Sequence, residues 1–300
     1  SRAGDLPSLP LTVGTNTATA LLAGFPLITR ATYDLVLRDA DGRSNKIAAQ
    51  FVFDAVSNRP PELKLAAPRG DIRPSPLEEI RFEGTVWDDF GVISHGIAFA
   101  PVGREPTYLQ LGKDIPRAER RGFLHLIRLE ELGVQPDELV SAFLWAEDIG
   151  PDGKVRRTEG DLLFAEVRPF EEIFREASGG GDQEEQGQQG GQSSPVTELV
   201  QLQKQIVSAT WNLQRTHRQA NPAYERDAEV VLDSQKNALE RAESQAGEAT
   251  NPQATALWEK VTSEMSTAVV RLGDAASSPS KLGPALAAEQ AAYQALLRLQ

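Results

Sequence analysis

The sequence predicts a multidomain β + α fold in which strand modules come first and antiparallel helices follow. Residues 1–170 consist of short apolar runs separated by Pro, Gly, Asp and Asn, a pattern typical of strands joined by turns. Residues 195–300 are rich in Ala, Gln, Glu and Leu and place apolar residues at helical spacing. Residues 177–194 contain no large apolar residue, so we expect residues 171–194 to form a flexible linker.

The better defined strand module lies in residues 58–170. Apolar and polar side chains alternate in residues 80–86, which is the period-2 pattern of a half-buried strand. Candidate strands cover residues 62–68, 80–87, 92–100, 107–112, 123–129, 139–147 and 161–169. Seven short strands with turn signals between them are typical of an immunoglobulin-like (Ig-like) β-sandwich, and we predict a complete one here.

An internal repeat indicates a second strand module at the start of the chain. The stretch "YDLVLRDADGRSNKIAAQFVFDAV" (33–56) parallels "SAFLWAEDIGPDGKVRRTEGDLLFAEVRPF" (141–170). Each is an apolar strand, an Asp-Gly turn, a polar stretch and a second strand. Residues 1–57 are too short for a whole sandwich, so we expect the C-terminal part of an Ig-like module, with its early strands upstream of residue 1. The prolines of "SNRPPEL" (57–63) predict a stiff hinge.

A recurring start signal divides residues 195–300 into four predicted helices. A capping side chain precedes a proline at Ser194-Pro195, Asn221-Pro222, Asn251-Pro252 and Ser278-Pro279, and the last helix has an alternative start at Pro284. Apolar residues follow at 3,4 spacing, with Gln235 as a polar member of the second seam. Starts about 30 residues apart favour a four-helix bundle or coiled-coil hairpins, with a helical repeat array as the alternative.

Composition limits the classes of partner. The net charge is −12, which argues against tracking nucleic-acid phosphates and against docking on anionic lipid. The chain has no cysteine, which excludes a disulfide scaffold and thiolate catalysis. No run approaches the roughly 18 apolar residues of a membrane span. The chain begins without Met, so we interpret it as an excised segment, which leaves open a membrane anchor or a targeting signal outside it.

The motifs give no support to an enzyme. Asp89-Phe90-Gly91 matches the metal-binding tripeptide of protein kinases, but the Gly-rich loop and the His-Arg-Asp motif are absent. Because the tripeptide lies between two predicted strands, we interpret Asp88 to Gly91 as a turn in which the Asp88 side chain bonds local backbone amides. We expect His95 and His125 to be packed strand residues and Trp211 and Trp258 to be core residues.

Acidic side chains suggest an alternative role as a binding module. In a seven-strand sandwich the B–C and F–G loops lie at one end, together with the entry of the first strand. This arrangement would gather five candidate ligands for Ca²⁺, a cation that prefers six to eight oxygens: Asp88, Asp89, Asp148, Asp152 and Asp54. No other cofactor is indicated. A glycan is the other ligand considered at this pole, with Trp87, Tyr108 and Trp145 as candidate aromatic contacts or, alternatively, sandwich core.

The order of several stretches resembles one family. "RPPELKLAAPRGDI", "EGTVWDDFGV", "VSAFLWAEDIGPDG" and "FAEVRPFEEIFRE" are followed by a Gln/Gly linker, "LVQLQKQIVSATWNLQR", "LDSQKNALERA" and "ALAAEQAAYQALLRLQ". The chain is similar to an uncharacterised family of very large bacterial envelope proteins. The resemblance implies a membrane-anchored parent chain, Ig-like modules and a Gln-rich helical region on the extracytoplasmic or periplasmic side. It implies no catalytic residues.

The function predicted from these observations is non-catalytic. The sandwiches are expected to act as spacers, and the helices are expected to bind a protein partner or a second copy of the chain. Neither nucleic acid nor direct membrane contact is expected within this segment.

Overall fold

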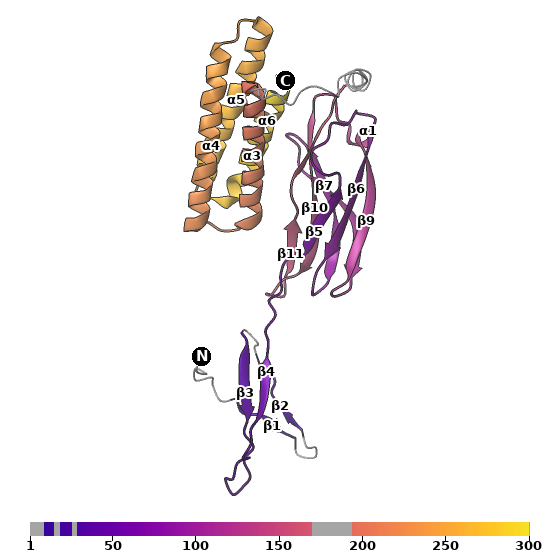
Figure 1. The fold of residues 1–300 in the computed structure, drawn as a ribbon, viewed down its shortest axis with the longest axis vertical. Coiled ribbons are helices and arrows are strands. Elements are labelled where there is room, and N and C mark those ends of the chain that lie inside the picture. Colours follow the sequence, from indigo (N-terminus) through magenta and orange to yellow (C-terminus); the bar gives the residue numbers. More distant parts are fainter. Residues whose placement is uncertain (1–8, 15–18, 26–28, 170–193, 300) are drawn as a thin grey trace, which may run out of the picture. The chain divides into compact units, whose positions relative to one another are not determined.

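A computed structural model describes residues 9–14, 19–25, 29–169 and 194–299. It divides into two compact units, Ser1–Asn58 and Arg59–Gln300. Both the strands and the helices of the predicted β + α class are present (Figure 1). The predicted linker at 171–194 lies outside the described residues, apart from Ser194.

The first unit contains two antiparallel strand pairs. These are β1 (Thr12–Val13) with β2 (Ala20–Leu21), and β3 (Ala31–Leu35) with β4 (Ala49–Phe53). Between β3 and β4 the Asp39 carboxylate accepts hydrogen bonds from the backbone amides of Asp41 and Arg43, as expected at an Asp-Gly turn. The rings of Phe25, Tyr33 and Phe53 meet edge to face.

Residues 62–167 of the second unit form two antiparallel sheets, called here the two-sheet module. One sheet has the order β5 (Glu62–Ala67), β6 (Glu79–Trp87), β9 (Arg120–Arg128). The other has the order β11 (Val155–Glu159), β10 (Leu139–Ile149), β7 (Val92–Pro101), β8 (Thr107–Ile115), and β12 (Leu163–Glu166) also pairs with β10. A short helix, α1 (Leu129–Leu132), follows β9. Side chains from both sheets share one apolar core.

The sequence-based prediction of seven strands was wrong by one, because β11 was read as a polar stretch. β11 has the sequence Val-Arg-Arg-Thr-Glu, which gives no apolar alternation. It forms because its backbone pairs with Trp145–Ile149 of β10, at an edge of the sheet where polar side chains remain in contact with solvent. The other strands match the predicted segments closely.

Strand β10 is buried on both faces. Val140, Ala142 and Leu144 point into the core between the two sheets. The alternate residues Leu139, Phe143 and Trp145 belong to a second apolar cluster, which includes residues of the helices described next. A helical layer therefore covers the outer face of the five-stranded sheet.

The helices begin close to the predicted capping residues. They are α3 (Pro195–Thr216), α4 (Pro222–Gly247), α5 (Pro252–Ala275) and α6 (Leu282–Leu297), with a short 3₁₀ turn, η1 (Pro279–Lys281), before α6. Ser194, Asn221 and Asn251 each accept a hydrogen bond from a first-turn amide. The last helix begins neither at Pro279 nor at Pro284, since η1 absorbs the proline and α6 starts at Leu282. No helix among the described residues is long and apolar enough to cross a membrane.

The four helices, called here the helical region, lie side by side around one core (Figure 1). α3 contacts α4 and α6, and α5 contacts α4 and α6, so the helices close a ring. Gln203 of α3 and Gln235 of α4 exchange hydrogen bonds through their amides at 2.9 and 3.0 Å. Thr210 donates to the Glu289 carboxyl at 2.7 Å. The core therefore contains a layer of polar side chains. Of these, the sequence analysis had identified Gln235 as a polar residue among the apolar positions of its helix.

Glu289 gives the helical region a predicted dependence on pH. Its side chain is 0% exposed, and burial raises the pKa of its carboxyl well above the ordinary value. Because the unfolded chain ionises at a lower pH than the folded chain, stability should fall as the pH rises above the unfolded pKa of about 4.3. Glu289→Gln should reduce this fall in urea unfolding measured between pH 4 and pH 8. The exposed Glu240→Gln is the control, and equal slopes for Glu289→Gln and the unsubstituted chain would contradict the prediction.

Candidate functional site

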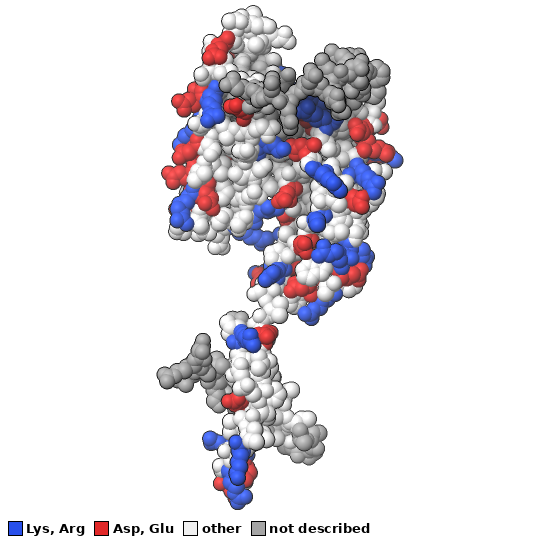
Figure 2. All heavy atoms as spheres, in the orientation of Figure 1, with Lys and Arg blue, Asp and Glu red and all other residues white. Residues whose placement is uncertain are grey.

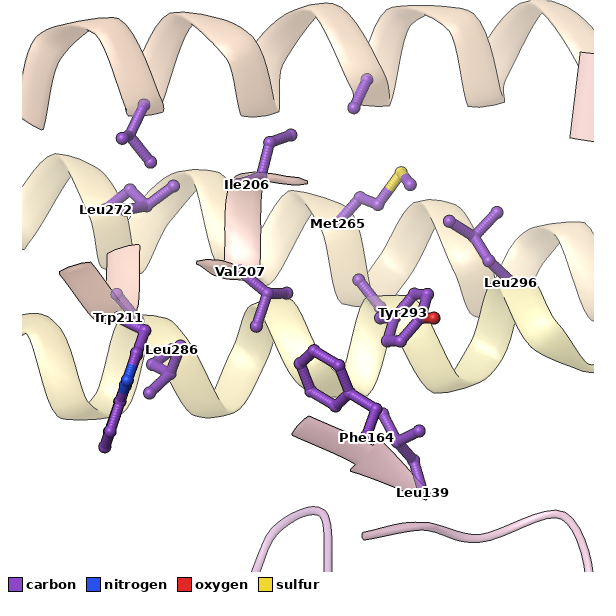
Figure 3. Packing of buried hydrophobic residues seen from close by; sticks show 14 of the residues in the cluster. Leu139, Phe164, Ile206, Val207, Trp211, Met265, Leu272, Leu286, Tyr293 and Leu296 are labelled. Atoms are coloured by element: carbon purple, nitrogen blue, oxygen red, sulfur yellow. The ribbon is translucent and has the colours of Figure 1, made fainter. Parts of the chain in front are cut away.

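The two-sheet module and the helical region of the second unit meet at a buried interface, called here the junction. The rings of Phe143 and Trp211 are 4.6 Å apart between centroids, and those of Phe164 and Tyr293 are 5.3 Å apart. Figure 3 shows Phe164 and Leu139 pointing toward the helices, with Phe164 beside Tyr293. All five of these side chains are buried. The outer face of β10 and β12 is thus closed by α3 and α6.

Polar contacts fix the relative position of the two surfaces. The Trp211 indole N–H donates to the Gly160 carbonyl at 3.0 Å, so this buried donor has a partner. A Phe at this position would have no N–H to make the bond. Lys204 pairs with Asp71 at 2.7 Å. At another point the Gln294 amide donates to the Asp137 carbonyl at 3.0 Å. Directional bonds of this kind restrict how an apolar interface can slide, so the junction has a defined geometry.

Two arginines, Arg215 in the last turn of α3 and Arg218 just after the helix, bind the backbone of the edge strand β11. Arg215 donates to the Glu159 carbonyl at 3.1 Å, and Arg218 donates to the Arg157 carbonyl at 3.3 Å. Arg215 also pairs with Asp161 at 3.0 Å. Free carbonyls on an edge strand invite pairing with another strand. The arginines occupy two of them and so protect this edge.

A cleft of 640 Å³ lies beside these contacts. Its lining combines strand β11, the C-terminal end of α3 and the chain before β5: Pro60, Pro61, Leu63, Arg156, Arg157, Thr158, Glu159, Gln214, Arg215, Thr216 and Arg218. In Figure 2 basic side chains gather around a hollow where the helical region meets the two-sheet module. The lining thus holds four guanidinium groups and one carboxyl group.

The charged groups in the cleft are held by their neighbours. The Arg157 guanidinium lies over the rings of Tyr108 (4.6 Å) and Trp145 (5.0 Å) and donates twice to Glu147. Burial raises the pKa of Glu159, although nearby arginines act in the opposite direction. Burial and the charge of Glu159 raise the pKa of the Tyr108 hydroxyl. Among the lining residues themselves, arginines outnumber carboxyl groups four to one.

The predicted acidic pole is assembled around an arginine. Asp148 is 0% exposed and Asp88 is 1% exposed. The Arg156 guanidinium makes a bidentate ion pair with Asp148. The hydrogen bond to Asp148 raises the pKa of Arg156, and the charges of Asp148, Asp88 and Asp152 act in the same direction. Three of the predicted calcium ligands therefore lie near Arg156, which pairs with one of them, Asp148.

The remaining members of the calcium hypothesis are placed differently. Asp89 lies next to Asp88 in the connection from β6 to β7 and adds to the raised pKa of Asp88. Asp54 belongs to the first unit, where it pairs with Arg30 at 3.3 Å. In the described part of the chain, no group of three or more His, Asp or Glu side chains is arranged to hold a metal ion. The calcium site stays a prediction without an assembled ligand set.

The connection that contains Asp-Phe-Gly has the expected side-chain bond. Asp88 Oδ1 accepts from the Phe90 amide at 2.8 Å, and Gly91 has φ +102°, a conformation that favours glycine. A Cβ at Gly91 would also lie 2.9 Å from the Ile115 carbonyl oxygen. The residues after Asp88 serve to redirect the chain into β7.

The aromatic candidates for glycan binding do not form one exposed platform. Trp145 is 4% exposed and lies beneath Arg157, and it belongs to the cluster shared with the helices and not to the core between the two sheets. Tyr108 is 41% exposed, and its hydroxyl interacts with Glu159. Trp87 donates to the Ala118 carbonyl at 3.3 Å.

His95, expected to be a packed strand residue, is buried, and burial lowers the pKa of its imidazole.

Sequence reasoning missed the junction and its arginines. The run Leu-Val-Ser-Ala-Phe-Leu-Trp-Ala at the start of β10 contained the relevant signal, because it is almost continuously apolar. A strand with one solvated face alternates, whereas a strand covered on both sides does not. Trp211, expected inside the helical core, lies at the boundary with the sheet.

Comparisons with known proteins provide no family. No protein-family model matches the chain, and no curated protein matches it. Similar solved structures include Spo0M, the sporulation control protein from Bacillus subtilis, at 14% identity and TM-score 0.27, covering 41% of this chain and 56% of that chain. Another, described as pT26-6p, has 14% identity and TM-score 0.28, covering 79% of this chain and 45% of that chain. The chain spans less than two thirds of either, and likeness at this level assigns neither fold family nor activity.

Proposed function

We propose that this chain is a non-catalytic structural and interaction segment, in which the strand modules act as spacers and the helical region contacts a protein partner or a second copy. The observation that carries the proposal is the junction. Buried aromatic side chains and directional hydrogen bonds attach the helical region to the outer face of the five-stranded sheet. Through these contacts the two-sheet module holds the helices in a defined position, which is a structural role and not a catalytic one.

Exposed apolar residues on the helices support the interaction part of the proposal. Val230 of α4 is 66% exposed and Val270 of α5 is 61% exposed, and neither helix makes the ring contacts that join α3 and α6 to the sheet. We therefore propose that the partner binds α4 and α5. The partner is expected to be a protein rather than nucleic acid, in agreement with the net charge of −12.

Site-specific crosslinking tests this assignment. A photo-crosslinking amino acid at Val230 or at Val270 of the parent protein in its native cell should give a discrete adduct with one partner or with a second copy. Leu124 of β9, which is 56% exposed, is the matched control in the two-sheet module. Adducts that are equally strong at Leu124, or absent at all three positions, would contradict the proposal. A hydrolase or transferase activity abolished by a point mutation would refute the non-catalytic assignment.

The fold type of each module and the location of the parent protein are part of the same proposal. We infer that the two-sheet module is an Ig-like β-sandwich, that the first unit is the C-terminal part of another, and that the helices form an antiparallel bundle of the coiled-coil type. We also infer that the parent is a membrane-anchored bacterial envelope protein with this segment on the extracytoplasmic side. Protease accessibility of the segment in spheroplasts tests the location, because a segment on the cytoplasmic side would be protected.

A cation at the acidic pole is the second candidate function. The observation in its favour is Asp88 Oδ2, which is buried and has no hydrogen-bond partner among the described residues. Burial, together with the charges of Asp148 and Asp89, raises the pKa of Asp88, and a cation would relieve that cost. Calorimetric titration with Ca²⁺ is decisive, since neither heat nor a thermal shift would exclude this candidate.

A further inference from the structure

The arginine-lined cleft has the size and charge of a small-ligand site. Its volume of 640 Å³ lies within the range of about 300–1,000 Å³ common for ligand pockets. Four arginines face it and one carboxyl group opposes them. Arginine presents five N–H donors in a planar fork that matches the oxygens of carboxylates and phosphates. The lining therefore favours an anionic ligand.

The arginines are also held in place before any ligand arrives. Arg157 is fixed by Glu147 on one side and by the Tyr108 and Trp145 rings beneath it. Arg215 is fixed by Asn212 and Asp161. Side chains that are already ordered lose little conformational entropy on binding, which strengthens association.

Arg218 retains most of its hydrogen-bonding capacity. Among the described residues it makes one hydrogen bond, from Nη2 to the Arg157 carbonyl at 3.3 Å, which leaves four of the five guanidinium donors for a ligand. Arg156, Arg157 and Arg215 form close ion pairs with Asp148, Glu147 and Asp161, whereas the charge of Arg218 acts on the Glu159 carboxyl of the same cleft from a longer distance. Arg218 is thus the lining arginine with the most N–H donors left for a ligand.

We propose that this cleft binds a small soluble ligand that carries at least two anionic oxygen groups, either phosphate or carboxylate. One part of the ligand would contact strand β11 and another the end of α3. Because both sides of the junction line the cleft, the ligand would bind the docked arrangement in preference to a separated one and would stabilise it. The site is independent of the partner surface proposed on α4 and α5.

Calorimetry on the whole 300-residue chain at low ionic strength tests the site, with pyrophosphate and citrate as probes. We expect saturable binding of one probe molecule per chain, by pyrophosphate, by citrate or by both, which identifies the preferred oxygen group. Arg218→Ala should weaken the affinity by roughly tenfold or more, the effect of losing a charged hydrogen bond. Arg218→Gln should weaken it similarly while keeping a donor for the Arg157 carbonyl, so it separates loss of charge from loss of the junction contact.

Lys204→Ala is the matched control. Lys204 is a cation on the same helix that also bridges to the two-sheet module, through Asp71, but it does not line the cleft. Its replacement should leave the affinity within about twofold, because Lys204 does not line the cleft. The proposal is overturned if neither probe binds, or if Lys204→Ala weakens binding as much as the Arg218 variants do, which would indicate general electrostatic attraction.

Discussion

Arg156→Met is expected to lower the free energy of unfolding by about 3–5 kcal/mol, the usual cost of removing one partner from a buried ion pair. Asp148 is 0% exposed, and Arg156 is the cation that neutralises it. Asp88 adds a second buried carboxyl group nearby. Without the guanidinium, these side chains must be protonated or hydrated at the end of β10. Urea unfolding at neutral pH measures the change.

Two further variants determine whether the charge is responsible. Arg128→Met removes an arginine that bridges Glu79 and Glu131 but has a side chain that is 59% exposed, so a change of about 0–1 kcal/mol is expected. Combining Arg156→Met with Asp148→Leu should recover much of the lost stability, because the fully buried carboxylate that pairs with Arg156 is removed with it and only Asp88 remains. A loss in Arg156→Met no larger than in Arg128→Met would show that the acidic pole does not depend on Arg156.

Trp211→Ala is expected to weaken the junction by about 3–5 kcal/mol, the usual range for removal of a buried Trp side chain. The side chain is 5% exposed, packs on Phe143 and donates to the Gly160 carbonyl. The helices themselves retain most of their shared core. We therefore expect hydrogen exchange to increase selectively in β10 and β11, while helical circular dichroism is kept.

Trp258→Ala is the control for this result. Trp258 is 6% exposed and lies in α5, within the core of the helical region. Its removal should weaken the helices at least as much as it weakens the junction, so exchange should increase in α5. If Trp211→Ala increases exchange in the helices and leaves β10 protected, the junction is not held by this residue.

Local patterns made most of the fold predictable. The capping side chains before prolines located three helix starts, because capping and the fixed φ of proline act within a few residues. Alternation located β6 for a similar reason. β11 was not predicted, because its strand conformation depends on pairing with β10 and not on the pattern of its own side chains. The start of the last helix was not predicted, because Pro279 begins a 3₁₀ turn and not an α-helix.

The site was less predictable, because its members meet through tertiary contacts. The charge of Asp148 acts on Asp88, because the end of β10 lies beside the start of β7, which follows the connection that contains Asp88. The cation that pairs with Asp148 is Arg156 of the unrecognised strand β11, so this ion pair was not predicted. The cleft combines three segments, 60–63, 156–159 and 214–218, and no short sequence motif indicates that segments so far apart meet.

The covering of β10 by later residues has a consequence for synthesis. Phe164 emerges from the ribosome roughly 130 residues before Tyr293, and translation at about 5–20 residues per second makes that interval about 7–26 s. Throughout it, the aromatic face of the five-stranded sheet has no α6 to cover it. Nascent chains stalled before α6 should therefore bind holding chaperones, and release should coincide with the emergence of the last helix.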